Sequence, residues 1–212
     1  DVSVVWVESA WDPIIPNLNA GEMCDVIISA MTKTATRDEV VDFTTAYYTS
    51  SQGVIGGTGA ASISGVADLN AAGVTVGVQS GTTSDIYANG DATNDAMLPD
   101  ATVVGYEDFP TVIAALNNGD VMYALGDAPV LSLSGTLMTT FSDENFGFAV
   151  REDSGELLDA LNMAISAIVD SGEYDDIYAA SFNGAVTLAD DSTADTAMAY
   201  PATPDGSGDL AG

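Results

Sequence analysis

The sequence contains no histidine, a single cysteine and only three basic residues. Without histidine it cannot build a Ser-His-Asp triad or a histidine metal site. Cys24 alone can form neither an intrachain disulfide nor a cysteine metal cluster. These absences exclude the commonest hydrolytic and metal-dependent chemistries, and we expect no metal ion and no other cofactor.

Positive charge is scarce against 32 Asp and Glu, so the formal net charge is −29. Such a charge argues against binding to nucleic acid and to anionic membrane surfaces. No apolar run reaches the ~18 residues of a membrane-spanning helix. The chain of 212 residues is 47% hydrophobic, enough for one large or two small domains with a real core, so the acidity is a surface property.

Two of the basic residues, Lys33 and Arg37, lie within one segment, residues 24–48. A guanidinium is a planar fork of donors that matches a carboxylate. Hydroxyl side chains that could assist it lie just upstream: Ser29, Thr32 and Thr34. The alternative is a surface ion pair between Arg37 and an acidic neighbour on a solvated helix. The segment alone leaves both interpretations open.

Apolar runs and alternating patterns predict strands over 2–7, 26–28, 74–78, 103–106, 121–125 and 146–150. Helical spacing and start signals predict helices from Asp12-Pro13, over 36–41 and 64–72, around Ile86, over 108–116, from Pro129, and over 155–171 and 174–182. This order of elements indicates an α/β fold.

Two places in this pattern have the features of a ligand site. The first is residues 79–84, Gln-Ser-Gly-Thr-Thr-Ser, where a strand, small polar residues and a helix follow one another, an arrangement that captures anions. The second is Asp127, at the end of a strand where open α/β sheets bind ligands. Each has an ordinary alternative, a helix N-cap by Thr82 or Thr83 and by Asp127.

The order of motifs resembles a known family. The motifs are W-x-x-I-I-P-x-L (11–18), D-V-I-I-S-A-M-T with T-x-x-R (25–37), V-D-F-T-x-x-Y-Y (41–48), V-G-V-Q-S-G-T-T (76–83), A-L-N-N-G (115–119) and F-G-F-A-V-R (146–151). They resemble the family 3 solute-binding proteins of polar amino-acid ABC importers, which have the type II periplasmic-binding fold. The resemblance covers residues 1–182.

This resemblance implies two α/β lobes joined by two hinge crossings that close over an amino acid. The first lobe would comprise 1–53 and 145–183, the second 54–144, and residues 184–212 would form a flexible acidic tail. The family's opening strand and helix have no counterpart, so we expect a processed or truncated chain whose first lobe is incomplete. Unpaired backbone and exposed apolar surface would then make it poorly stable.

The resemblance also implies roles for particular residues. Arg37 would grip the α-carboxylate of the ligand, and Asp127 would take its α-ammonium from the second lobe. Trp11 would lie against the ligand. The whole implied ligand-binding set is Trp11, Ser29, Ala30, Thr32, Arg37, Ser80, Thr82, Thr83 and Asp127.

The implied function is that of a monomeric, non-enzymatic receptor, periplasmic or extracellular and with or without a lipid anchor. It would deliver a free amino acid to the membrane subunits of an ABC permease. The negative field disfavours an acidic ligand. Two alternatives share the fold: a sensory ligand-binding domain, and a cyclohexadienyl dehydratase-like enzyme in which a Glu would serve as the acid or base.

Overall fold

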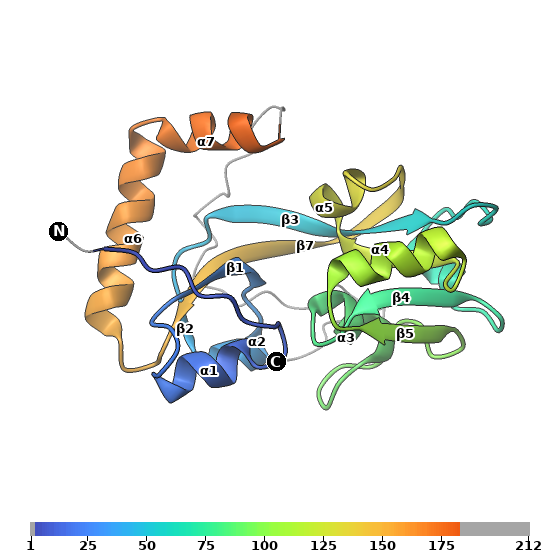
Figure 1. Ribbon diagram of the computed structural model, residues 1–212, viewed down its shortest axis with the longest axis horizontal. Helices are drawn as coiled ribbons and strands as arrows, with labels where there is room; N and C mark the ends of the chain where they lie inside the picture. The colour runs from blue at the N-terminus through green and yellow to red at the C-terminus, as the bar shows by residue number, and fades with distance from the viewer. Residues whose placement is uncertain (1–2, 183–212) are drawn as a thin grey trace. The chain divides into compact units, whose positions relative to one another are not determined.

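The computed structural model describes residues 3–182 (Figure 1). These residues divide into two compact units, which we call unit 1 (3–14 and 50–144) and unit 2 (15–49 and 145–182). The chain passes between the units near 14, 49 and 144. Unit 2 therefore differs from the lobe predicted over 1–53 and 145–183 at two limits, because residues 3–14 and 50–53 belong to unit 1. The Trp11 indole joins the first of these segments to unit 1, since it donates to the carbonyl of Gly81 at 2.9 Å.

Both units are built from alternating strands and helices, and the α/β class is confirmed. Unit 1 contains η1 (Val66–Leu69), β4 (Thr75–Gln79), α3 (Thr83–Asn89), β5 (Thr102–Tyr106), α4 (Phe109–Asn118), β6 (Tyr123–Asp127) and α5 (Ala128–Ser132). Unit 2 contains β1 (Ile27–Thr32), α2 (Ala35–Asp38), β2 (Asp42–Phe43), α6 (Gly155–Asp170) and α7 (Glu173–Phe182). Helix α1 (Ile14–Ala20) starts where the chain enters unit 2, and strands β3 (Tyr48–Gly56) and β7 (Leu137–Val150) run through both units.

The strands form a mixed sheet in the order β1-β7-β3-β6-β4-β5, with β2 also pairing with β7. Strand β4 is parallel to both β5 and β6, whereas β3 is antiparallel to β6. In that antiparallel pair Gln52 lies opposite Asp127. A polar pair therefore lies at the end of β6, where the chain leaves the sheet for α5.

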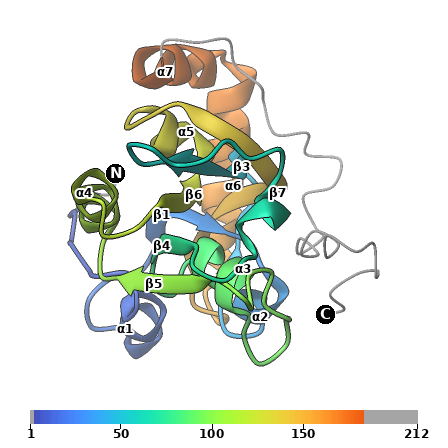
Figure 2. The same ribbon diagram turned by 90° about the vertical axis from the view of Figure 1, so that its right-hand side faces the viewer.

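The sheet of unit 1 is buried on both faces. Val76 and Val78 of β4 pack into one apolar cluster with Leu125, while Val112 and Leu116 of α4 belong to a second cluster. Successive strand residues point to opposite faces, so alternate positions supply the two clusters. Figure 2 shows α3 and α4 on opposite sides of β4 and β5. The core of unit 1 is therefore a helix–sheet–helix sandwich.

Helix α4 shows how the local sequence sets the limits of an element. Asp108 caps its start and accepts hydrogen bonds from the hydroxyl and the backbone N–H of Thr111, which lower the pKa of this carboxyl. Gly119 ends the helix in the left-handed conformation that glycine adopts without strain. The predicted helix over 108–116 is thus confirmed, with an end two residues later.

Helix α7 is fixed to unit 2 by its tyrosines. The Tyr174 hydroxyl donates to the carbonyl of Tyr47 at 2.6 Å, and Tyr178 stacks on Tyr48 with ring centroids 5.9 Å apart. Burial raises the pKa of Tyr174, so its hydroxyl remains a donor well above neutral pH.

The predicted strand over 2–7 is wrong for residues 3–7, which form no helix or strand. Val4, Val5 and Trp6 are 70%, 80% and 77% exposed. Their β-branched and aromatic character favours a strand, but a strand also needs a neighbour whose backbone pairs with it. No strand in the described part of the chain pairs with this segment, so its apolar side chains stay in solvent.

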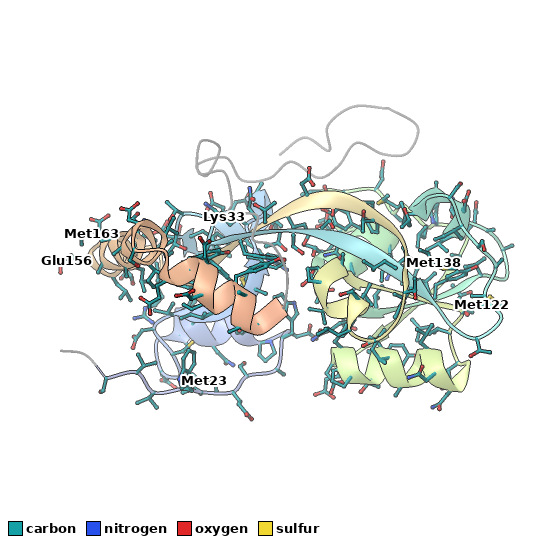
Figure 3. All side chains as sticks on the ribbon, turned by 90° about the horizontal axis from the view of Figure 1, so that it is seen from above. Met23, Lys33, Met122, Met138, Glu156 and Met163 are labelled. Carbon is teal, nitrogen blue, oxygen red and sulfur yellow. The ribbon has the colours of Figure 1, made fainter. Side chains whose placement is uncertain are left out.

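Helix α6 matches the predicted amphipathic helix, but its apolar face is only partly covered. None of its residues is buried, and Met163 is 67% exposed. Glu156 and Met163 are labelled on α6 in Figure 3. Polar contacts of Asn162 fix the helix: its side-chain oxygen accepts hydrogen bonds from the backbone N–H of Thr45 at 2.8 Å and from the Thr45 hydroxyl at 3.3 Å. No helix within residues 3–182 has the length and apolar character needed to cross a membrane.

We predict that Val5→Ser changes the free energy of unfolding by less than about 0.5 kcal/mol, because an exposed side chain far from special features contributes little. The matched change in the core, Leu125→Ala, should lower it by about 2–5 kcal/mol, because Leu125 is 1% exposed and leaves a cavity. Denaturant unfolding of the three proteins gives both values. If Val5→Ser lowers the free energy of unfolding by more than about 1 kcal/mol, the exposed position of Val5 is contradicted.

Candidate functional site

Arg37 is held at the end of β1 by the turn that begins α2. Thr34 caps α2 and accepts a hydrogen bond from the backbone N–H of Arg37 at 3.2 Å. The guanidinium Nη1 donates to the carbonyl of Thr32 at 2.9 Å. Arg37 is only 8% exposed, which contradicts the alternative of a solvated helix surface. Arg37 and Thr32, both predicted ligand contacts, are therefore adjacent in unit 2.

Lys33 is a second buried cation beside this turn, and the predicted ligand set omits it. Its backbone N–H donates to Asn145 of β7 at 2.9 Å, and its side chain is 7% exposed. A Cβ on Gly147 would lie 3.2 Å from the Lys33 methylenes, so the glycine makes room for this side chain. Lys33 is labelled in Figure 3. Two of the three cations thus occupy neighbouring positions.

Ala30 lies in β1 with a backbone φ of 49°, in the left-handed region that alanine rarely adopts. The pairing of β1 with β7 shifts register between Ile27 and Met31, so the strand bulges around this residue. Ser29 and Ala30 are both exposed. Strained backbone of this kind concentrates at functional sites.

In unit 1, Trp11 and the loop between β4 and α3 form one cluster. The Trp11 indole donates to Gly81, whose backbone N–H donates to the Asp85 carboxylate at 2.9 Å. Gly81 has a φ of 71°, and a Cβ there would lie 2.6 Å from the carboxylate of Asp12. Glycine is therefore required both by the turn and by the close approach. The cluster places Trp11 next to the predicted residues Ser80 and Thr82.

Asp127 belongs to a buried polar network in unit 1. The Gln52 amide nitrogen lies 2.7 Å from Asp127 Oδ1 and 2.9 Å from Glu144 Oε2. Its oxygen accepts a hydrogen bond from the Ser84 hydroxyl at 2.7 Å. The Thr83 hydroxyl donates to Glu144 Oε2 at 3.1 Å. Gln52 and Glu144 are both 0% exposed.

The helix-cap alternatives fail for two predicted site residues. Thr82 and Asp127 occupy the N-cap positions of α3 and α5, yet neither side chain makes a capping hydrogen bond. The Thr82 hydroxyl instead donates to the carbonyl of Gln79 at 2.7 Å. Their side chains therefore do not cap the helices that start there.

The predicted residues thus fall into two groups. Ser29, Ala30, Thr32 and Arg37 lie together in unit 2, whereas Trp11, Ser80, Thr82, Thr83 and Asp127 lie in unit 1. Sequence reasoning missed Gln52 and Glu144. The sequence contains one signal for them, a polar residue beside the apolar residues of a strand. Gln52 directly precedes Gly-Val-Ile, and Glu144 lies just before the apolar run over 146–150.

Arg151, the remaining cation, has a structural role. It donates to the carbonyls of Leu18 and Cys24 at 3.3 and 3.0 Å and pairs with Asp25 at 3.0 Å. These contacts fix the loop between α1 and β1 against the end of β7. Arg151 therefore secures unit 2 and is not part of the candidate site.

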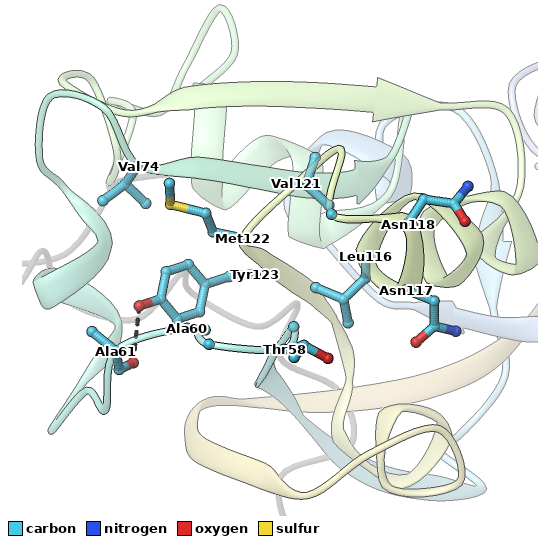
Figure 4. A pocket seen from close by; sticks show the side chains of 13 residues that line it. Thr58, Ala60, Ala61, Val74, Leu116, Asn117, Asn118, Val121, Met122 and Tyr123 are labelled. Atoms are coloured by element: carbon cyan, nitrogen blue, oxygen red, sulfur yellow. Dashed lines mark hydrogen bonds between the residues drawn. The ribbon is translucent and has the colours of Figure 1, made fainter.

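A pocket of about 610 Å³ lies at the opposite end of β6 from Asp127 (Figure 4). Leu116, Val121, Met122 and Tyr123 line it, and the Tyr123 hydroxyl donates to the carbonyl of Ala61 at 2.9 Å. None of the predicted ligand residues lines this pocket. Within residues 3–182 no cluster of acidic, cysteine or histidine side chains has the arrangement of a metal site.

Residues 1–184 match the family of bacterial extracellular solute-binding proteins, family 3. Two curated proteins illustrate it. A probable histidine-binding protein of Neisseria gonorrhoeae is 30% identical over 182 residues, which are 81% of this chain and 65% of that protein. ABC transporter arginine-binding protein 1 of Escherichia coli (strain K12) is 31% identical over 180 residues, 79% of this chain and 70% of that protein.

The fold agrees with these matches. The crystal structure of an ancestral amino acid-binding protein, described as a precursor of cyclohexadienyl dehydratase, matches with a TM-score of 0.78 and 32% identity. The match covers 85% of this chain and 78% of that one. This chain therefore has the fold of such binding proteins, and spans about two thirds of the length of the histidine-binding relative.

We predict that Ala30→Gly raises the free energy of unfolding by about 1 kcal/mol, because glycine adopts a φ of 49° without the cost that alanine pays. The opposite sign is expected for Ala160→Gly, on the exposed side of α6, where glycine costs about 1 kcal/mol. Denaturant unfolding measures both. If Ala30→Gly destabilises as much as Ala160→Gly, the left-handed backbone at Ala30 is wrong.

Proposed function

Because this chain belongs to the bacterial extracellular solute-binding proteins, family 3, we propose that it is an amino-acid receptor of an ABC importer. It binds a free amino acid outside the cytoplasm as a monomer and delivers it to the permease subunits, with or without a lipid anchor. Its relatives are named as binding proteins, which supports a role without catalysis.

The observation that carries this proposal is the separation of charge between the two groups of residues. Unit 2 holds Arg37 and Lys33, two buried cations in a chain that has only three. Unit 1 holds Asp127 and Glu144 around one amide. An amino acid carries an α-carboxylate and an α-ammonium. The cations of unit 2 are complementary to the carboxylate, and the acidic side chains of unit 1 are complementary to the ammonium.

In this proposal Arg37 binds the α-carboxylate with its planar fork, assisted by Thr32 and by the backbone at Ser29 and Ala30. Asp127 binds the α-ammonium. The two units act as lobes that close over the ligand through the crossings of β3 and β7, and closure removes water from these charges. Ser80, Thr82, Thr83 and Trp11 contribute from unit 1.

The ligand side chain is cationic or neutral. A net charge of −29 produces a field that repels an acidic side chain and attracts a cationic one. The indole of Trp11 offers a face on which a guanidinium or an aromatic ring can stack. The histidine-binding and arginine-binding relatives support the same choice.

We predict that one or more of the twenty amino acids, with L-arginine and L-histidine tested first, raises the melting temperature. At a concentration about 100 times Kd the shift should be about 5–10 °C, because a ligand that binds only the folded form stabilises it by mass action. A scan of melting temperature against the whole panel identifies the ligand.

Arg37→Ala and Asp127→Asn should each weaken binding about 10- to 100-fold, because each removes a hydrogen bond to a charged group. Arg37→Lys should also weaken it, since a lysine keeps the charge but loses the fork. The matched control is Asp120→Asn, an exposed carboxylate at the far end of α4, which should bind as the unmodified protein does. If no amino acid shifts the melting temperature of a cooperatively folding protein, the proposal is wrong.

A further inference from the structure

Gln52 lies at the centre of a polar network that connects three neighbouring strands with a helix. It sits on β3, between β7 with Glu144 and β6 with Asp127, and it also contacts Thr83 and Ser84 at the start of α3. Every member of the network belongs to unit 1. Gln52, Glu144, Thr83 and Ser84 are at most 4% exposed, so their hydrogen bonds are shielded from water.

The hydrogens of the Gln52 amide set the orientation of this network. The Gln52 amide nitrogen has two hydrogens. Its two short contacts, at 2.7 and 2.9 Å, go to the carboxylates of Asp127 and Glu144, whereas Thr83 Oγ1 lies at 3.3 Å. Carboxylates are the stronger acceptors, so they take both hydrogens. The amide therefore fixes the position of two carboxylates at once.

The hydroxyl hydrogens of Thr82 and Thr83 are also used within the protein. Thr83 donates to Glu144 at 3.1 Å, and Thr82 donates to the Gln79 carbonyl at 2.7 Å. Each hydroxyl therefore presents its oxygen, not its hydrogen, to a ligand. An oxygen that has given its hydrogen elsewhere can accept from an ammonium but cannot donate to a carboxylate.

Electrostatics favours the same class of ligand group. Two carboxylates that share one amide donor repel each other, and burial makes that repulsion stronger than it is in water. A cationic group of a ligand beside Asp127 offsets this repulsion. Unit 1 is therefore organised as an acceptor for an ammonium group.

We infer, on the basis of the proposed function, that Gln52 and Glu144 are positioning residues for the α-ammonium of the ligand. Gln52 holds the Asp127 carboxylate in place. Glu144 takes the hydrogen of Thr83 and so turns that hydroxyl into an acceptor.

The test separates an effect on the ammonium from a general loss of structure. Gln52→Leu removes the amide and keeps the size of the side chain, and Glu144→Gln removes one charge and keeps the shape. Each variant is titrated calorimetrically with L-arginine and with 5-guanidinopentanoic acid, which lacks only the α-amino group. L-histidine and 3-(imidazol-4-yl)propanoic acid form a second matched pair.

Each variant should bind the amino acid about 10- to 100-fold more weakly than the unmodified protein, because hydrogen bonds to a charged group are lost or misdirected. Its affinity for the deamino analogue should change less than about threefold, because that analogue has no ammonium to lose. Equal losses for the amino acid and its analogue would overturn the inference and leave the proposed function intact.

A matched control is Glu107→Gln, an exposed carboxylate outside the network. It should bind each pair as the unmodified protein does. If Gln52→Leu does not fold, Glu144→Gln decides the question by the same comparison. If none of the twenty amino acids binds the unmodified protein, the proposed function itself fails, and this is seen before any variant is compared.

Discussion

The amide of Gln52 is the interaction on which much of unit 1 depends. It lies in the middle of the sheet, with its two hydrogens on carboxylates from the strands at either side and its oxygen on Ser84 of α3. A buried carboxylate without a donor is costly, and here two carboxylates share one donor group. The apolar clusters on both faces of the sheet give unit 1 its stability. The amide joins β3 to β6, β7 and the start of α3 through hydrogen bonds.

The scarcity of cations makes each one informative. In most proteins lysines and arginines are numerous and mostly solvated, so a single one says little. Here Arg151 joins the α1–β1 loop to β7, and Arg37 and Lys33 are buried near the end of β1. None of the three serves as an ordinary solvated surface charge. A strongly acidic chain has kept cations where their geometry or burial matters.

The sequence predicted the fold better than it predicted the details of the candidate site. Helix α4 followed from Asp108, the apolar spacing and Gly119, because capping and periodicity are local signals. Residues 3–7 were assigned wrongly, because β propensity is local but pairing is not. Gln52 and Glu144 were missed for the same reason: 92 positions separate them, and only the sheet brings them within 2.9 Å. The orientation of the Thr82 and Thr83 hydroxyls also depends on partners that no local pattern reveals.

The hydrogen bond from Trp11 to Gly81 has an optical consequence. The chain has two tryptophans, Trp6, which is 77% exposed, and Trp11, which is partly buried against the β4–α3 loop. Indole emission shifts with the polarity and the hydrogen bonding of its surroundings. Trp6 contributes the emission of a solvated indole, whereas the emission of Trp11 responds to changes at the β4–α3 loop. The protein thus contains its own fluorescent reporter at the loop that holds Ser80 and Thr82.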